Sequence, residues 1–351
     1  MVWRFLGIRE KMIKTMEEMT TVEKLVSIII PFYRVSQQRL DTVLTSINNQ
    51  IGIDFQRVEV ILVNDGGPQM TLPVAPVLQF TVRMIQRTDN QGAGVARQAG
   101  MDVATGRYYM FVDADDQLQN VNALETFFRA VQFHGDRDIL ISKYLEQLVD
   151  DERGGYRYVV HRNHNWTAPV AKWFNRAFID EIGLRWRDDL RVFEDTYFVG
   201  LACDLAERIY YMDDVTYVWL HNAQSTVRQN DGAFTSQLHV WARMNHAYLD
   251  MIAMQLPARL LATFGDYVAD SYLRTQKYVA ADPAAFEREH QQLMVAYEDL
   301  WPQVKPQLKH LVTDIIETSG EFGDGTTFKL RAFIKQQDQL YQAHQKNTDL
   351  T

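Results

Sequence analysis

The sequence predicts an α/β fold: an open, mostly parallel central sheet with crossover helices, followed by a helical C-terminal region. Two features predict it. Short runs of β-branched and other apolar residues stop abruptly at turn residues, and stretches with apolar residues at helical spacing separate these runs. The order strand, helix, strand, strand, helix, strand is typical of an α/β sheet, whose ligands gather at the carboxyl ends of the strands.

The elements follow in chain order. The first strand begins at Val26 and is expected to stop at Pro31, and its unbroken apolar character is typical of a strand buried on both faces. The expected strands are 26–30, 58–63, 80–85, 108–112 and 139–142, and the expected helices include 40–47, 95–103 and 124–131. Later in the chain the helical pattern dominates, with Asp282 as the cap of a helix whose first turn holds Pro283.

The composition excludes several classes of protein. The 351 residues are 46% hydrophobic and 23% charged, which is typical of a folded globular chain. With 36 basic and 45 acidic residues the net charge is -9, which opposes binding to phosphate backbones and argues against nucleic acid as a partner. Cys203 is the one cysteine, so neither an intramolecular disulfide nor a thiolate metal cluster is expected, and a reducing, cytoplasmic location is favoured.

The pattern divides the chain into three parts: an amphipathic N-terminal arm (1–22), a catalytic domain (23–230) and a helical C-terminal domain (231–351). The turn residues at 229–232 suggest the second boundary. The arm has a polar face of mixed sign, which favours packing or a homo-oligomer contact; peripheral contact with the inner face of a membrane is the alternative. No run of residues reaches the roughly 18 apolar positions that a membrane-spanning helix needs.

Acidic residues follow the expected strands where a ligand site would form. Asp65 comes after the second strand, and Asp113 and Asp115 come after the fourth. An Asp-x-Asp at a strand end offers hard oxygen ligands for Mg²⁺ or Mn²⁺, and such a cation can neutralise the two phosphates of a nucleotide donor. Acidic turns are also common at solvated strand ends, so the pattern alone leaves both interpretations open.

Four segments in this order resemble glycosyltransferase family 2: VSIIIPFY (26–33), VILVNDG (60–66), NQGAGVAR (90–97) and FVDADD (111–116). The resemblance covers residues 24–225. It implies a GT-A fold with a Rossmann-like central sheet, nucleotide-sugar donors and inversion at the anomeric carbon. Three positions depart from the usual family residues, namely Arg34, Asn64 and Gly67, and these leave the selectivity for base and sugar open.

The resemblance also implies the donor site. Asp65 would accept a hydrogen bond from the base, usually uracil, which implies a UDP-sugar. Asp115 would bind the metal, and Asp113 would contact the sugar or ribose. The other donor-binding residues implied are Pro31, Phe32 and Tyr33 beside the base, Asn90, Gly92 and Arg97 around the ribose and phosphates, and Ala114 within the Asp-x-Asp.

The second half of the resemblance implies a general base. The segment FEDTYF (193–198) matches the family segment whose second acid deprotonates the acceptor hydroxyl, which is Asp195 here, and Glu194 would orient the site or touch the acceptor. A charged first turn of a helix is the alternative interpretation of both residues. His221 would add a metal or phosphate contact, with a surface-loop histidine as the alternative.

The sequence therefore predicts an inverting, metal-dependent glycosyltransferase that acts on a glycan, cell-wall polymer or glycoprotein acceptor. A nucleotidyltransferase would need a basic, glycine-rich loop after the first strand, where this chain has Pro31-Phe32-Tyr33. A non-catalytic carbohydrate-binding or scaffold protein that retained the fold is the other alternative. The presence of Asp65, Asp115 and Asp195 argues against it.

Overall fold

A computed structural model describes residues 22–72, 77–223, 233–319 and 326–348. These residues form two compact units. The first unit comprises the described residues up to Asn165 together with Pro169–Glu181 and Arg208–Leu220, and the second comprises Trp166–Ala168, Ile182–Glu207 and the described residues from His221 onward. The predicted N-terminal arm, apart from Val22, and the predicted boundary between residues 230 and 231 lie outside the described residues, so both stay predictions.

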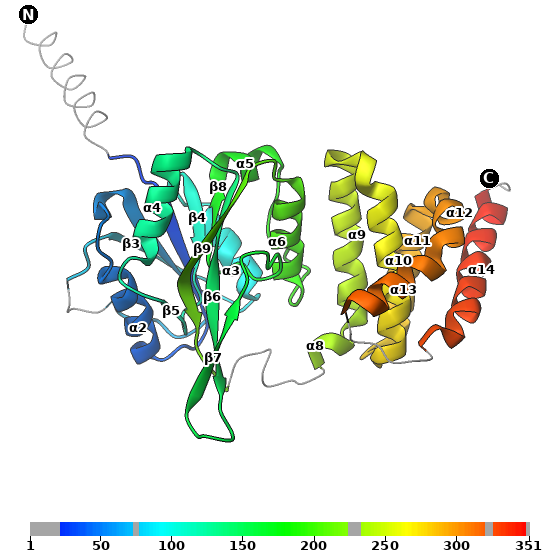
Figure 1. The fold of residues 1–351 in the computed structure, drawn as a ribbon, viewed down its shortest axis with the longest axis horizontal. Helices are drawn as coiled ribbons and strands as arrows, with labels where there is room; N and C mark the ends of the chain where they lie inside the picture. The colour runs from blue at the N-terminus through cyan, green and yellow to red at the C-terminus, as the bar shows by residue number, and fades with distance from the viewer. Residues whose placement is uncertain (1–21, 73–76, 224–232, 320–325, 349–351) are drawn as a thin grey trace, which may run out of the picture. The chain divides into compact units, whose positions relative to one another are not determined.

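The first unit contains a nine-stranded sheet within the described chain, in the order β3-β2-β1-β4-β8-β6-β9-β5, with β7 paired to β6 (Figure 1). The strands are β1 (Val26–Phe32), β2 (Val58–Asn64), β3 (Thr81–Gln86), β4 (Tyr108–Phe111), β5 (Gln117–Leu118), β6 (Ile139–Val149), β7 (Tyr156–His161), β8 (Lys172–Asn175) and β9 (Ile209–Trp219). Strands β1 to β4 are parallel, and β6 is parallel to β9. Strands β5, β7 and β8 run antiparallel to their neighbours, so the predicted, mostly parallel sheet is confirmed.

Burial of the strands agrees with their composition. Every residue of β1, β2 and β4 is buried, as expected of mainly apolar strands covered on both faces. Strand β3 differs, because it lies at the edge of the sheet and is partly exposed. Strand β1 continues through Pro31 to Phe32, beyond its predicted end. Proline is tolerated there because β4 pairs with β1 only as far as Ile29, so Pro31 has no ladder partner in β4 that needs an N–H.

Helices cover the sheet of the first unit. They are α2 (Gln37–Asn48), α3 (Ala93–Met101), α4 (Ala123–His134) and the short α5 (Arg176–Glu181), with the 3₁₀ turn η1 (Phe55–Arg57) before β2. Helix α3 packs against β1 and β2, α4 against β9, and α2 against β5. Ser36 caps α2, because its side chain accepts a hydrogen bond from the Arg39 N–H.

The second unit is helical. Its helices are α6 (Glu194–Leu205), α8 (Ala233–Ser236), α9 (Leu238–Gln255), α10 (Leu260–Lys277), α11 (Pro283–Ala296), α12 (Trp301–Val304), α13 (Leu308–Ser319) and α14 (Leu330–Thr348). The predicted cap of α11 is confirmed, since the Asp282 side chain accepts from the Ala285 N–H at 2.9 Å. Among the described helices, none combines the length and apolar character needed to span a bilayer.

Candidate active site

The carboxyl ends of β1, β2 and β4 bring most of the predicted donor-binding residues to one edge of the sheet in the first unit. Phe32 ends β1, Asp65 follows β2 and Asp113 follows β4 shortly after its last residue. The backbone ties two of these strand ends together, because the Asp65 N–H donates to the Phe32 carbonyl at 2.8 Å. Of the three residues predicted beside the base, Pro31 and Phe32 are buried within β1, whereas the Tyr33 side chain is 42% exposed.

Asp65 is the most enclosed of the predicted donor-binding acids. Its Oδ2 accepts hydrogen bonds from the backbone N–H groups of Gln91 (3.0 Å) and Gly92 (2.8 Å). Its Oδ1 lies 3.0 Å from Nε of Arg87, which makes an ion pair. Yet among the described residues this oxygen has no hydrogen bond of acceptable geometry. We infer attraction between the two charges without a well-directed hydrogen bond, which leaves acceptor capacity on a buried carboxylate.

Glycines make this arrangement possible at two positions. Gly66 has a φ of 77°, and a Cβ there would lie 2.5 Å from the Asp89 carbonyl carbon. Both the backbone conformation and the lack of space therefore exclude a side chain. Gly92 has a φ of 102° and opens α3 with its N–H directed at Asp65. The loop from β3 to α3 therefore wraps the carboxylate with backbone donors.

The departures at Asn64 and Gly67 have a structural explanation. Asn64 is fully buried, and its Nδ2 donates to the Pro68 carbonyl (2.7 Å) and to Oε1 of Gln86 (2.9 Å). Its Oδ1 accepts from the Gly67 N–H at 2.9 Å. A Cβ on Gly67 would lie 2.7 Å from that same oxygen. Asn64 and Gly67 therefore form one closed turn behind Asp65. Arg34, the third departure, lies over the Tyr33 ring at 5.0 Å.

The predicted metal ligand and its neighbour each face an arginine. Asp113 Oδ1 lies 3.0 Å from Nη2 of Arg97 in α3, and Asp115 Oδ2 lies 3.3 Å from Nη1 of Arg39 in α2. Both carboxylates are partly exposed, at 37% and 30% of the side chain. Ala114, between them, is buried. The Asp-x-Asp thus presents two accessible carboxylates, each of which forms an ion pair with an arginine.

Asp116 is buried and anchors the acidic turn to β9. Its carboxylate accepts hydrogen bonds from the Tyr217 hydroxyl (2.7 Å) and from the Leu220 N–H (2.8 Å), and the same hydroxyl accepts from the Asp113 N–H (3.1 Å). Burial, with the nearby charges of Asp113 and Asp115, raises the pKa of Asp116 well above its usual value. Asp116 therefore holds the turn in place, whereas Asp113 and Asp115 remain accessible.

Sequence reasoning assigned no individual role to Arg39, Arg87, Asp116 or Tyr217. Arg87 lies four residues from Gln91 and donates to its side chain at 2.7 Å, so it belongs to the same loop as Asn90 and Gly92. Its position directly after a predicted strand could have suggested a role. Arg39 and Tyr217 gave no such signal, because only the fold brings α2 and β9 to the acidic turn.

Glu194 and Asp195 lie in the second unit, in the first turn of α6. Both side chains are partly exposed. The residue before them, Phe193, has a φ of 64°, which is a strained conformation for a bulky side chain, and its ring is buried. Such strain persists only where the surrounding packing imposes it, and it fixes the direction in which the helix begins.

Helix α6 is anchored to the C-terminal helices within the second unit. Gly200 lets the Tyr248 ring of α9 approach, since a Cβ would lie 3.1 Å from that ring. The Tyr248 hydroxyl donates to Asp204 (2.6 Å), which also pairs with Arg259 (2.9 Å). The helix that carries the predicted base is therefore held by residues that the sequence assigns to a separate C-terminal domain.

His221 follows β9 and is half-buried. Across the residues that the structure describes, no group of three or more His, Cys, Asp or Glu side chains is arranged to hold a metal ion by itself. The metal role of His221 accordingly stays a prediction, as do the individual roles of the other predicted site residues.

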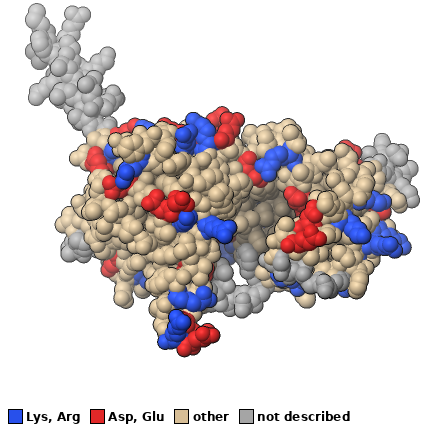
Figure 2. All heavy atoms as spheres, in the orientation of Figure 1, with Lys and Arg blue, Asp and Glu red and all other residues tan. Residues whose placement is uncertain are grey.

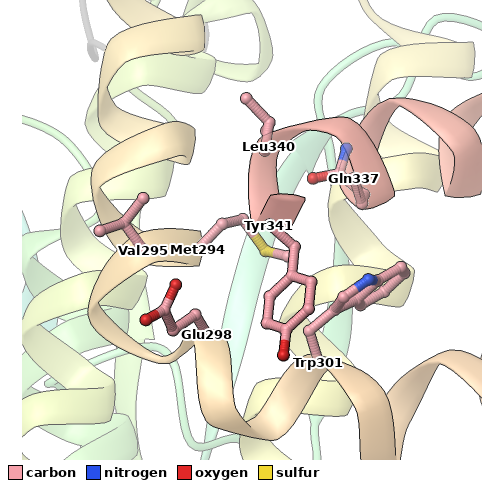
Figure 3. A pocket seen from close by; sticks show the side chains of 7 residues that line it. All are labelled: Met294, Val295, Glu298, Trp301, Gln337, Leu340 and Tyr341. Atoms are coloured by element: carbon pink, nitrogen blue, oxygen red, sulfur yellow. The ribbon is translucent and has the colours of Figure 1, made fainter. Parts of the chain in front are cut away.

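A small pocket in the second unit has none of the predicted site residues in its lining. Figure 3 displays the residues that line it: Met294, Val295, Glu298, Trp301, Gln337, Leu340 and Tyr341. The lining is mainly apolar, and Glu298 is its one carboxylate. It offers no pair of groups suited to sugar transfer.

A comparison with family models identifies the part of the chain that carries most of the predicted site residues. Residues 27–201 match the model of glycosyl transferase family 2. The chain belongs to this family. Apart from Val26, the match includes all four motif segments and the segment around Asp195, so the predicted family is confirmed.

Similar proteins in the family include bacterial glycosyltransferases. The glycosyltransferase GlyG of Streptococcus pneumoniae serotype 4 is 27% identical over 235 residues, which cover 59% of this chain and 74% of GlyG. The uncharacterized glycosyltransferase EpsJ of Bacillus subtilis strain 168 is 28% identical over 222 residues, which cover 57% of this chain and 62% of EpsJ.

Solved structures establish the fold over nearly the whole chain. S. aureus TarS 1–349 in complex with UDP-GlcNAc has a TM-score of 0.62 at 17% identity, and the match covers 92% of both chains. The complex of the same protein with UDP gives a TM-score of 0.60 at 18% identity over 92% of both chains. The GT-A fold with C-terminal helices is thereby confirmed.

Proposed function

We propose that this glycosyltransferase transfers a sugar from a UDP-sugar to a hydroxyl group of a glycan, cell-wall polymer or glycoprotein, with inversion and with the help of a divalent cation. One observation carries the proposal: buried Asp65 and the accessible pair Asp113 and Asp115 meet at the carboxyl edge of one sheet. Asp65 suits a nucleotide base, and the pair of Asp113 and Asp115 suits a diphosphate with its cation.

Asp65 suits a base that carries an N–H donor. Its Oδ1 is buried, charged and without a well-directed hydrogen bond among the described residues. The imide N–H of uracil would supply the missing donor, and the neighbouring Arg87 guanidinium could donate to a uracil carbonyl. The exposed ring of Tyr33 could stack on the base. A site that uses a buried acceptor in this way discriminates against bases that lack the matching donor.

The residues present fit a divalent cation that is shared with the donor. Mg²⁺ and Mn²⁺ are commonly held by one or two protein carboxylates together with substrate phosphates. Asp115, with Asp113 beside it, supplies such a partial set. When bound, the cation would neutralise charge on the diphosphate leaving group. Arg97 and Arg39 would add positive charge at the same edge.

Asp195 is the proposed general base, and Glu194 the acid that orients the site or touches the acceptor. An alcohol is a weak nucleophile, and a carboxylate that accepts its proton as the new bond forms raises its reactivity. A single displacement of this kind places the acceptor on the face opposite the leaving diphosphate, which inverts the anomeric carbon. The first-turn position of Asp195 on a packed helix supports this role, since it holds the carboxylate in a fixed direction.

Similarity suggests which donor to test first. The TarS structures were solved with UDP and with UDP-GlcNAc, and GlyG is named a glycosyltransferase. UDP-GlcNAc is therefore the first donor in a panel that also contains other UDP-, GDP- and CDP-sugars. The proposed location is the cytoplasm, including the inner face of the membrane.

The experiment has two parts. Calorimetry would measure UDP and UDP-GlcNAc binding with and without Mn²⁺, and donor hydrolysis would be followed in the wild type, in Asp195→Asn and in the exposed control Asp188→Asn. We expect binding that Mn²⁺ tightens, and a loss of turnover of about 10² to 10⁴ in Asp195→Asn alone. Glu194→Gln should lose less. Binding without metal dependence would contradict the role of Asp115, and the absence of any turnover in the wild type would support the scaffold alternative.

A further inference from the structure

The β6–β7 hairpin extends past the edge of the sheet that carries the proposed donor site (Figure 1). Leu140 and Met110 both pair with Trp173 of β8, so they lie at the same level of the sheet. Counting along β6, the residue level with Asp113 is Lys143. Strand β9 pairs with one edge of β6. On the other edge, β8 pairs with the start of β6 and β7 pairs with the rest, so β7 continues the position of β8, which is next to β4 in the sheet.

This register gives the reach of the hairpin. Tyr158 pairs with Gln147, four residues beyond Lys143, and Tyr156 pairs with Val149, six residues beyond. At about 3.3 Å per residue, the two tyrosines lie roughly 13 and 20 Å past the level of Asp113, along the strand direction. They lie in the same unit as the proposed donor site, beyond the carboxyl edge of its sheet.

One face of the hairpin is exposed and apolar. Residues at alternate positions share a face, and the hairpin face consists of Val149, Tyr156, Tyr158 and Val160 together with Leu145 and Gln147 of β6. The first four have exposed fractions of 43%, 56%, 53% and 53%, and Leu145 and Gln147 are partly buried. Gln147, paired with Tyr158, donates to the Tyr158 hydroxyl at 2.7 Å and so holds that ring in place. On the opposite face, at the end nearer the sheet, His161 stacks on Tyr144 and bonds to Glu146.

We propose that the hairpin face binds the acceptor glycan, several sugar units away from the hydroxyl that reacts. This inference rests on the proposed function. Tyrosine rings offer flat apolar surfaces for the C–H faces of sugars, and their hydroxyl groups and the Gln147 amide offer polar contacts at the edges. A monosaccharide at the donor site cannot reach the hairpin face, whereas an oligosaccharide or polymer can.

The size and surroundings of the hairpin face favour a glycan over a second copy of the chain. The two half-exposed tyrosines present roughly 250 Å² between them, and the valines add less, whereas a stable interface buries about 800 Å² per partner. At the tip, in loop 150–155, side chains of both signs lie together (Figure 2). A mixed charge pattern offers no field that would recruit a polyanion or an anionic membrane surface.

The test uses the full chain with Tyr156→Ala/Tyr158→Ala, and Arg157→Ala as the control from the opposite face of the same strand. Binding to an array of bacterial oligosaccharides of one to eight units is measured together with acceptor-free hydrolysis of UDP-GlcNAc. We expect the wild type to retain the longer glycans and not monosaccharides, the double variant to bind them at least tenfold more weakly, and the control to match the wild type. Hydrolysis should be equal in all three proteins.

Equal glycan binding by the double variant and the wild type would overturn the proposal, as would a wild type that binds no glycan of any length. A wild-type dimer that the double variant converts to monomer in sedimentation would also overturn it, because a second copy would then be the occupant. Failure of the proposed function looks different: no protein, including the wild type, would then hydrolyse any nucleotide sugar, whatever the array reports.

Discussion

Arg39 and Asp115 form an ion pair of 3.3 Å between the first turn of α2 and the acidic turn after β4. Asp115 is the proposed metal ligand, so the Arg39 guanidinium lies close to the carboxylate oxygen that a divalent cation would bind. Both side chains are more than a quarter exposed, and water therefore weakens their attraction. The pair makes Arg39 a competitor for the carboxylate before the metal binds.

We expect Arg39→Gln to bind Mn²⁺ more tightly in the absence of donor, because the competing charge is gone. A partly exposed pair is worth about 0.2–1 kcal/mol, which predicts a gain of roughly 1.5- to 5-fold. Electron paramagnetic resonance of free Mn²⁺ measures it directly. Arg83→Gln, on the exposed edge strand β3, is the control and should leave the affinity unchanged. Unchanged affinity in Arg39→Gln would refute the competition.

Asp65→Asn should weaken UDP binding while the site keeps its shape. The amide loses the charge that a base donor would meet, and hydrogen bonds to charged groups are worth about 1.5–3 kcal/mol, so the affinity should fall by roughly 10- to 150-fold. Calorimetry with UDP and without metal isolates this effect. Asp89→Asn, exposed in the same loop, should bind UDP like the wild type. An equal loss in both variants would point to the loop rather than to Asp65.

Glu59 is a structural carboxylate at the opposite end of the strands. Its Oε1 accepts from Ser27 Oγ (2.6 Å), the Thr105 N–H (2.6 Å) and the Gly106 N–H (3.2 Å). Burial opposes its charge, but these hydrogen bonds outweigh burial and lower the pKa of Glu59 below 4.5. The charged form is thus favoured on folding, so its stabilisation is present above pH 4.5 and is lost as the pH falls through the lowered pKa.

Glu59→Gln should therefore lower the free energy of unfolding at pH 7 by about 1–3 kcal/mol and flatten its decline at acid pH. Urea unfolding at pH 7 and at pH 3 measures both, because the contribution of Glu59 is lost below pH 4.5. Glu317→Gln, on the exposed side of α13, is the matched control and should change neither value appreciably. A parallel decline with pH in Glu59→Gln and the wild type would rule out the contribution of this carboxylate.

His290 should destabilise the second unit as the pH falls. It is buried, bonded to the Tyr267 hydroxyl (2.6 Å) and to Gln337 (3.0 Å), and burial lowers its pKa from 6.5 to about 4. The unfolded chain then binds a proton below pH 6.5 that the folded chain accepts only near pH 4. Stability is therefore lost between these values, by about 2 kcal/mol from pH 7 to pH 5.

His290→Gln removes the titrating ring, so its free energy of unfolding should change less between pH 7 and pH 5 than that of the wild type. Urea unfolding followed by circular dichroism measures the difference. His310→Gln removes an exposed histidine from α13 and should keep the wild-type dependence. The same loss between pH 7 and pH 5 in His290→Gln would assign the effect to other groups.

Much of the fold was predictable because local patterns agree with the tertiary structure. The buried runs that became β1, β2 and β4 consist mainly of apolar residues, which suit a strand covered on both faces, and turn residues follow β2 and β4. The run that became β3 was predicted as a strand without a place in the sheet, and it lies at the edge. Position in a sheet depends on the order of strands, which local sequence does not encode.

The candidate site divides in the same way. Asp65, Asp113 and Asp115 were predictable, because a carboxylate directly after a buried strand must lie at the carboxyl edge of the sheet. Arg39 comes from a helix and Tyr217 from a distant strand. Their approach to the acidic turn results from packing over long separations in sequence, and no local pattern reports it.

The sequence by itself thus determined the family, the sheet and the acids at its carboxyl edge, since each of these follows from residue type and spacing within a few tens of residues. The tertiary structure alone decided which charges meet those acids and where α6 belongs. That helix packs with α9 through Gly200 and Tyr248, although the sequence predicts it within the catalytic domain. The physical reason is that burial is a property of the whole chain: a side chain is sheltered from water by residues that are remote in sequence.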